Sequence, residues 1–230
     1  MNHLDQTLTL WLNGSDSIYL DRIAITVTST TTWIPLMLLL LYIIIRHNSI
    51  AATAETILAI ALCILLADQV ASSVCKPLFA RYRPAQNPLL MYTVDVVNGY
   101  RGGLYGFFPS HAANTFAAAT FLSQAFKYRR ASLWLYSWAL ANCWSRVYLG
   151  VHYVGDLMVG AAWGTLVGWG IYMLWHRYGH HTQFWCKACT ATATTADTAV
   201  FTSGGYNTKS LDALCAAIAL TYLTIAFVAL

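Results

Sequence analysis

Six long apolar stretches constrain the fold of this chain more than any other feature. They cover residues 24–45, 52–75, 110–126, 132–150, 153–175 and 211–230. Each is close to the roughly 20 apolar residues that a helix needs to cross a bilayer. Charged residues make up only 10% of the chain, against about a quarter in soluble domains. The sequence therefore predicts an all-α, polytopic membrane helix bundle of about six transmembrane helices, forming a single domain over residues 1–230.

A short amphipathic segment precedes the first stretch. Leu4, Leu8, Trp11 and Leu12 recur at helical spacing, which gives one apolar face to a helix in this region. A helix of this kind lies in the plane of the membrane interface. Because acidic and amide side chains interrupt the apolar positions of the first 20 residues, we expect an N-terminal interfacial helix and no signal peptide.

Two longer connections join the apolar stretches. Residues 76–109 contain several prolines and glycines, so a regular helix cannot cross the whole segment. Residues 176–210 contain Cys186 and Cys189 in a C-x-x-C arrangement near three histidines. A metal or redox role for this pair is one interpretation, but a lone C-x-x-C is weak evidence. A loop with two reduced thiols is the interpretation that we prefer.

The distribution of basic residues predicts an orientation. If the stretches alternate across the membrane, the turns near Arg46, Arg130 and Arg177 share one side, and basic loops stay in the cytoplasm. Residues 76–109 and the turn at His152 then face the extracytoplasmic side. That face is also basic, for which anion binding is a sufficient reason. The net charge of +4 lies in short clusters, so we expect no nucleic-acid partner.

Three segments distant in sequence bring polar side chains to that face. Residues 76–84 read KPLFARYRP, residues 109–111 read PSH, and residues 145–156 read SRVYLGVHYVGD. Lys76, Arg83 and Arg146 could bind an anion with several oxygens, such as phosphate, because guanidinium binds it bidentately and ammonium as a point charge. Backbone N–H groups at Ser110, at a helix start, would add donors.

Two histidines and a carboxylate in the same segments supply reactive groups. His152 and Asp156 are four residues apart near a helix start, so their side chains can share one face. A carboxylate can hold one imidazole nitrogen as N–H and leave the lone pair of the other free to attack. His111 is then available to protonate the leaving oxygen.

The spacing of these residues resembles that of the type 2 phosphatidic acid phosphatase family. Lys76, six residues, then Arg83-Pro84 looks like its first motif, and Arg146, five residues, His152, three residues, Asp156 looks like its third. The resemblance covers roughly residues 52–175. It differs at the second motif, usually Pro-Ser-Gly-His, because Pro109 occupies the usual serine position and Ser110 the usual glycine position.

The resemblance implies a role for each residue. His152 would be a nucleophile that forms a phosphohistidine, Asp156 its orienting partner and His111 the general acid. The phosphate would be held, without a metal or other cofactor, by four residues: Lys76, Arg83, Ser110 and Arg146.

The lipid itself is less well defined by the sequence. A site at headgroup level implies a lipid phosphate substrate that arrives from within the membrane. Among the family's substrates we favour undecaprenyl diphosphate, in a bacterial inner membrane, with lipid A, phosphatidylglycerophosphate and phosphatidic acid as alternatives. A lipid phosphotransferase would use the same phosphohistidine. An anion transporter is disfavoured, because it predicts charged or broken helices near the midplane. The sequence leaves the oligomeric state open.

Three further charged residues have two interpretations each. Arg81 and Arg101 belong either to the site or to the interfacial anchors of the membrane surface. Asp68 lies within an apolar stretch, where an ionised group is costly without a partner. It either pairs with a basic residue of the pocket or is a protonated or hydrated structural residue.

Overall fold

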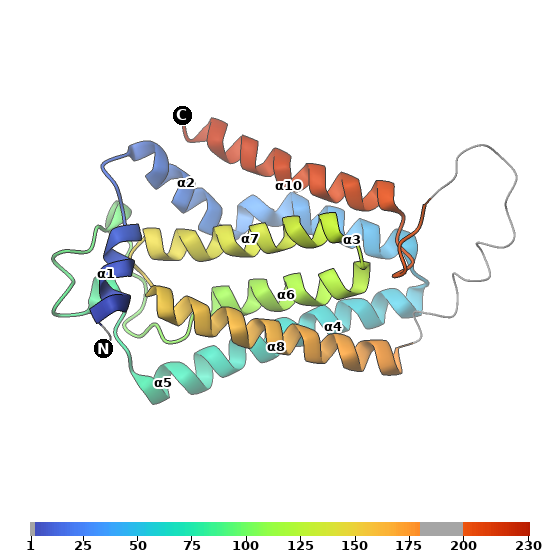
Figure 1. The fold of residues 1–230 in the computed structure, drawn as a ribbon, viewed down its shortest axis with the longest axis horizontal. Helices are drawn as coiled ribbons and strands as arrows, with labels where there is room; N and C mark the ends of the chain where they lie inside the picture. Colours follow the sequence, from blue (N-terminus) through green and yellow to red (C-terminus); the bar gives the residue numbers. More distant parts are fainter. Residues whose placement is uncertain (1–2, 180–199) are drawn as a thin grey trace, which may run out of the picture.

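The computed structural model of the protein describes residues 3–179 and 200–230, and its regular structure there is helical. Long helices run side by side along one axis (Figure 1). They are α3 (Ile34–His47), α4 (Ile50–Gln69), α6 (Ser110–Phe126), α7 (Arg129–Tyr148), α8 (Val154–Tyr178) and α10 (Thr208–Val228). The predicted all-α fold class is confirmed, while the Cys186–Cys189 pair lies outside the described residues.

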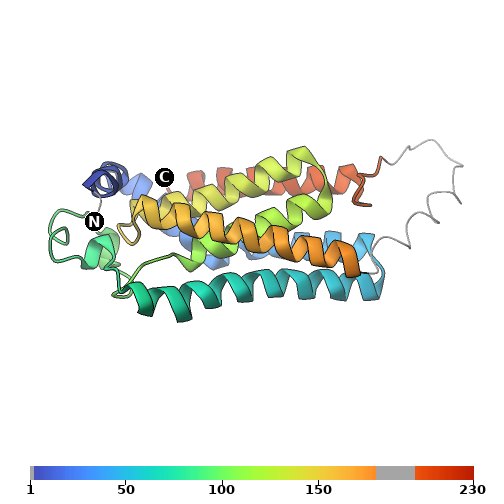
Figure 2. The same ribbon diagram turned by 60° about the horizontal axis from the view of Figure 1, so that its bottom comes forward.

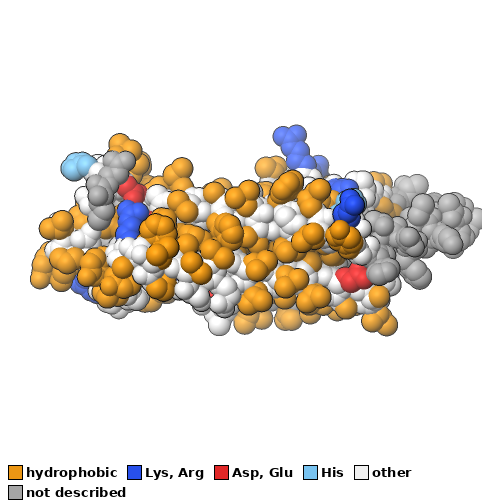
Figure 3. Space-filling view, turned by 90° about the horizontal axis from the view of Figure 1, so that it is seen from below, with side chains coloured by type: hydrophobic (Ala, Val, Ile, Leu, Met, Phe, Trp, Pro, Cys, Tyr) orange, Lys and Arg blue, Asp and Glu red, His pale blue; other side chains and the backbone are white. Residues whose placement is uncertain are grey.

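Four helical stretches of the described residues are long and apolar enough to cross a membrane. They are Thr30–His47, Ile50–Phe79, Val154–Tyr178 and Thr208–Val228. Helices α6 and α7 do not meet these criteria, so the predicted count of six spans is not confirmed. Much of α6 is buried against α4, α7 and α8, and small and polar residues can occupy positions that are shielded from lipid. Hydrophobic side chains cover most of the bundle face in Figure 3.

The first predicted span is interrupted. Helix α2 (Ile18–Thr28) ends within it, and a 3₁₀ turn over Thr30–Trp33 separates α2 from α3. The serine and threonine side chains of this run bond locally: the Thr32 hydroxyl donates to the Thr26 carbonyl at 2.6 Å, and the Ser29 and Thr31 hydroxyls lie 2.7 Å apart. Such bonds compete with the helical ladder, so hydropathy alone placed the helix start too early.

The second span extends further than predicted. Helix α4 continues through a π-helical turn (Val70–Cys75) into α5 (Lys76–Phe79), and the three form one long rod (Figure 2). Pro77 has no N–H with which to continue the α-helical ladder, and a π turn is one way in which a helix accommodates a local change in that ladder. The rod ends at Ala80, whose φ of 43° is left-handed.

Helices α6 and α8 pack at very close range. Three glycines at four-residue intervals on α8, Gly160, Gly164 and Gly168, face the first half of α6. A Cβ atom added to Gly164 would lie 2.2 Å from the carbonyl oxygen of Ala113. Small residues at this spacing let two helix backbones approach. The second and third polar segments are held at a fixed separation by this contact, because each begins one of the two helices.

The predicted N-terminal helix is present as α1 (His3–Leu12), which lies across the end of the bundle where α8 begins (Figure 1). Leu4, Leu8 and Trp11 are exposed. These side chains give α1 an exposed apolar side, as expected for a helix at a membrane interface.

Candidate active site

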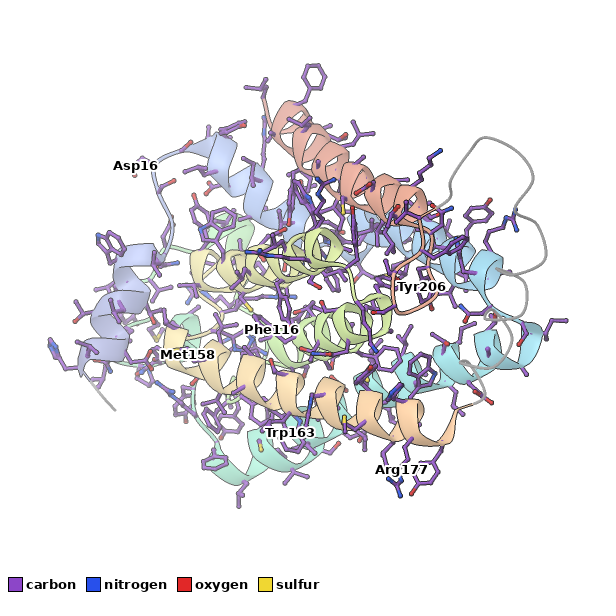
Figure 4. The ribbon with its side chains drawn as sticks, turned by 45° about the vertical axis from the view of Figure 1, so that its right-hand side comes forward. Asp16, Phe116, Met158, Trp163, Arg177 and Tyr206 are labelled. Atoms are coloured by element: carbon purple, nitrogen blue, oxygen red, sulfur yellow. The ribbon has the colours of Figure 1, made fainter. Side chains whose placement is uncertain are left out.

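The three polar segments meet at one end of the bundle. The end of α5, the start of α6 and the turn between α7 and α8 all lie near α1 (Figure 1). Met158 marks this end of α8, whereas Arg177 and Tyr206 lie toward the other end (Figure 4). The convergence follows from helix length, because each helix crosses the bundle once before the chain turns back.

Lys76 is placed by two hydroxyl groups. Its Nζ donates to Ser72 Oγ at 3.0 Å and to Ser110 Oγ at 2.9 Å, and the two hydroxyls lie 2.9 Å apart. Ser72 donates in turn to Asp68 Oδ1 at 3.4 Å. Asp68 therefore reaches the pocket through Ser72. Asp68, Ser72 and Lys76 follow one another at intervals of four residues, and this spacing was a signal for Ser72 that sequence reasoning missed.

Arg83 contacts the predicted nucleophile directly. Its Nη1 lies 2.8 Å from Nε2 of His152 and donates to the Val151 carbonyl at 3.2 Å. A guanidinium can only donate, so Nε2 must be the acceptor and carries the lone pair. In the neutral imidazole the proton is then on Nδ1. Burial and the charges of Arg83 and Arg146 hold the pKa of His152 well below its usual range, which keeps the ring neutral.

Arg146 contacts the second histidine. Its Nη2 is bonded to Nε2 of His111, and its Nη1 donates to the Tyr100 hydroxyl at 3.3 Å. Arg146 is buried near the end of α7, whereas His111 is exposed at the start of α6. In this arrangement Nε2 of His111 accepts a hydrogen bond. The predicted role of general acid therefore requires a proton on that ring when a phosphate binds.

Asp156 is bound by a residue that the sequence left ambiguous. Its Oδ1 is bonded to Nη1 of Arg81, and Nη2 of Arg81 donates to Asp5 Oδ2 at 2.6 Å. The predicted hydrogen bond between Asp156 and His152 is not among the contacts of the described residues. Oδ2 of Asp156 and Nδ1 of His152 are both buried and have no hydrogen-bond partner in the described parts of the chain. Asp5 was not predicted, since an acidic residue on an amphipathic helix carries no such signal.

Glycine lets the backbone approach the site. A Cβ atom on Gly106 would lie 2.9 Å from Cγ of Arg83 and 3.2 Å from Nδ1 of His152. Gly150, in the turn before His152, has a φ of +66°, and a Cβ there would lie 2.4 Å from a Val94 methyl. Both positions exclude a side chain, and they fix the connection 76–109 against the turn between α7 and α8.

A pocket of about 400 Å³ shares Arg81 with the site. It is mostly aromatic and apolar, with Arg81 on its wall, and its lining is Phe79, Ala80, Arg81, Tyr82, Asn87 and Phe107. Arg101, by contrast, donates to the Ala85 carbonyl at 2.7 Å and holds the loop. Of the two ambiguous arginines, Arg81 lies in the site and Arg101 supports it.

The cluster is thus a basic pocket around one neutral imidazole. Lys76, Arg83, Arg146 and His111 all act on the charge of His152. Ser110 bonds to Lys76, so every residue predicted from the sequence lies at this end of the bundle. Among residues 3–179 and 200–230, no three side chains of His, Cys, Asp or Glu are grouped so that they could hold a metal ion.

The fold and the site together define a helical membrane protein in which a histidine, surrounded by basic residues, can attack a bound phosphate. The chain belongs to the PAP2 superfamily, whose profile matches residues 54–180. It is therefore a phosphoric ester hydrolase that acts on a lipid phosphate at the membrane.

Two curated relatives extend the comparison. The chain is 38% identical over 181 residues to a lipid A 4′-phosphatase of Bacteroides thetaiotaomicron, covering 77% of this chain and 79% of the relative. It is 32% identical over 172 residues to a lipid A 4′-phosphatase of Porphyromonas gingivalis, covering 75% and 73%. No solved structure shows a significant match.

Proposed function

We propose that the protein removes the 4′-phosphate of lipid A by way of a phosphohistidine on His152. The observation that carries the proposal is the 2.8 Å contact between the Nε2 lone pair of His152 and the Arg83 guanidinium. A phosphate that accepts from Arg83 in place of Nε2 would lie next to that lone pair and leave it free to attack. The substrate assignment is supported by two relatives with that printed activity, each matched over about three quarters of this chain.

The mechanism assigns one task to each residue. Lys76, Arg83, Ser110 and Arg146 bind the phosphoryl oxygens and stabilise the charge that they carry in the transition state. Nε2 of His152 attacks phosphorus, the bond from phosphorus to the lipid oxygen breaks, and His111 protonates that oxygen. Water then attacks the phosphohistidine and releases inorganic phosphate, with His111 accepting the proton of the water. On this proposal Asp156 orients His152 during the reaction, when its unpaired Oδ2 accepts from Nδ1–H of His152, a bond that is not formed in the structure described above.

The cavity beside Arg81 supports a substrate that is bulky next to its phosphate. Its wall of Phe79, Tyr82 and Phe107 offers aromatic faces to a sugar or an acyl chain. Leu78 and Phe79 are exposed on the outside of α5, where lipid would surround the helix. A lipid-linked phosphate can therefore approach from the bilayer.

We also propose that the site faces the extracytoplasmic side of a bacterial inner membrane. Arg46, Arg130 and Arg177 lie toward the end of the bundle opposite α1, and basic loops stay in the cytoplasm. On this proposal α6 and α7 also cross the bilayer, since they run beside the four apolar spans (Figures 1 and 2).

Phosphate release from a panel of lipids tests the proposed function. Purified protein in EDTA is given lipid A, undecaprenyl diphosphate, phosphatidylglycerophosphate and phosphatidic acid, with His152→Ala as the control. We expect metal-independent release from lipid A, with mass spectrometry showing loss of the 4′-phosphate. Preferential release from undecaprenyl diphosphate would restore the preference drawn from the sequence, and a need for added Mg²⁺ would contradict the phosphohistidine.

The same assay distinguishes hydrolysis from the alternative activity of a lipid phosphotransferase. With ³²P at the 4′ position, hydrolysis gives labelled inorganic phosphate, whereas transfer gives a labelled second lipid when an acceptor lipid is present. We expect inorganic phosphate.

A further inference from the structure

Helix α1 does more than lie on the membrane surface, because its polar side contacts the start of α8. Thr9 is 1% exposed, and its hydroxyl accepts from the Val154 N–H at 3.2 Å. Oδ1 of Asp5 accepts from the Gly155 N–H at 2.8 Å. The N-cap residue of α8, Tyr153, makes no side-chain capping bond of its own. Since the first N–H groups of a helix need acceptors, α1 supplies them from a distant part of the chain.

The other oxygen of Asp5 reaches the candidate active site. Oδ2 accepts from Nη2 of Arg81 at 2.6 Å, while Nη1 of Arg81 is bonded to Asp156. Arg81 is also held from one side, because its guanidinium lies 4.3 Å from the centre of the Tyr153 ring. One guanidinium is thus shared by two carboxylates, one on α1 and one on α8.

This sharing determines which oxygen of Asp156 is available. Arg81 binds Oδ1, so Oδ2 is the atom that can accept from Nδ1–H of His152, and both atoms are buried without partners in the described chain. Among the described residues, Arg81 is the side chain that is hydrogen-bonded to this fully buried carboxylate. Any change in the position of Arg81 is therefore transmitted to Asp156.

We propose that Asp5 is a positioning residue, through which α1 fixes Arg81 and thereby the Asp156 carboxylate that orients His152. The inference rests on the proposed function of His152 as nucleophile. Without the charge of Asp5, Arg81 loses one of its two carboxylate partners and is free to move beside Asp156. The Asp156 carboxylate then no longer holds the imidazole of His152 in the orientation that attack on phosphorus needs.

Asp5→Asn is the central variant, because the amide oxygen can still accept from the Gly155 N–H while the ion pair with Arg81 is lost. We expect kcat to fall about tenfold, in the range for small displacements of catalytic groups, with KM changed less than twofold. Asp5→Glu should restore part of kcat.

Two further variants separate positioning from a merely structural effect. Thr9→Val removes a capping bond without touching Arg81, so it should lower the unfolding temperature and leave kcat within about threefold of wild type. Asp16→Asn changes an exposed carboxylate between α1 and α2 (Figure 4) and should change neither. A wild-type kcat for Asp5→Asn, or an equal loss of kcat in Thr9→Val, would overturn the proposal.

A measurement that does not depend on phosphate release tests the positioning role of Asp5 separately from the proposed function. Histidine ¹⁵N NMR follows the hydrogen bonding of the ring nitrogens of His152 in detergent micelles. In Asp5→Asn the Nδ1 signal of His152 should shift, because the Asp156 carboxylate is displaced, and in Asp16→Asn it should not. An unchanged Nδ1 signal in Asp5→Asn would refute the positioning role. Failure of wild-type protein to release phosphate from any lipid, with the Nδ1 signal shifted as expected, would instead refute only the proposed function.

Discussion

The glycine contact between α6 and α8 gives the sharpest prediction for this protein. Gly164→Ala adds a single methyl group at a point where it would lie 2.2 Å from the Ala113 carbonyl oxygen. This is about 1 Å less than the 3.4 Å at which ordinary contact begins. The obstacle is backbone rather than a mobile side chain, so the two helices have to separate.

The separation acts on catalysis because of where α6 begins. Ser110 and His111 lie within one turn of Ala113, while Asp156 lies on α8. A displacement of about 1 Å between catalytic groups can lower the rate about a hundredfold, which equals about 2.7 kcal/mol of transition-state stabilisation. We expect the kcat of Gly164→Ala to fall about a hundredfold. We also expect its free energy of unfolding to fall by about 1–3 kcal/mol, because the added methyl group overpacks the helix contact.

The assay is phosphate release from lipid A in detergent, paired with thermal unfolding of the same preparation. Gly170→Ala is the matched control, because a Cβ on Gly170 would meet nothing within 4 Å. Gly170→Ala should keep the wild-type kcat. Its free energy of unfolding should rise by up to about 1 kcal/mol, because alanine has a higher helix propensity than glycine. A wild-type kcat for Gly164→Ala would refute the claim that this contact sets the geometry of the site.

Four further outcomes are expected. His152→Ala should lower phosphate release on the order of 10⁴-fold with unchanged unfolding temperature, because no other group replaces a nucleophile. Arg83→Lys should lower kcat/KM at least about tenfold, since an ammonium cannot bind phosphate bidentately. Ser110→Ala should cost about 1 kcal/mol in kcat/KM, the net worth of one hydrogen bond, because Lys76 keeps its bond to Ser72. The rate should fall as the pH falls through the lowered pKa of His152, below the ordinary value of 6.5, because a protonated imidazole has no lone pair with which to attack.

These outcomes are checked by initial rates, by KM measured at fixed detergent-to-lipid ratio and by pH profiles from about pH 4 to 9. Full activity of His152→Ala would place the nucleophile elsewhere. An acid limb centred above pH 6.5 would contradict a buried, neutral His152 among positive charges.

The apolar stretches and the fixed spacings determined most of what could be known before the structure. Hydropathy predicted the bundle because a bilayer requires long apolar helices. Spacing placed Lys76, Arg83 and His152 at one end of the bundle because alternating helices return the chain to the same side. Hydropathy missed the break before α3, where local hydroxyl bonds matter more than apolarity.

Only the tertiary structure decided which charged groups are paired. The sequence could not reveal that Asp5 and Asp156 share Arg81, because a salt bridge between residues 5 and 81 depends on where α1 lies across the bundle. Nor could it show that Nε2 of His152 carries the lone pair, which follows from the direction of one guanidinium N–H. Periodicity and spacing assign residues to helices and faces, whereas hydrogen-bond direction depends on three-dimensional contacts between distant segments.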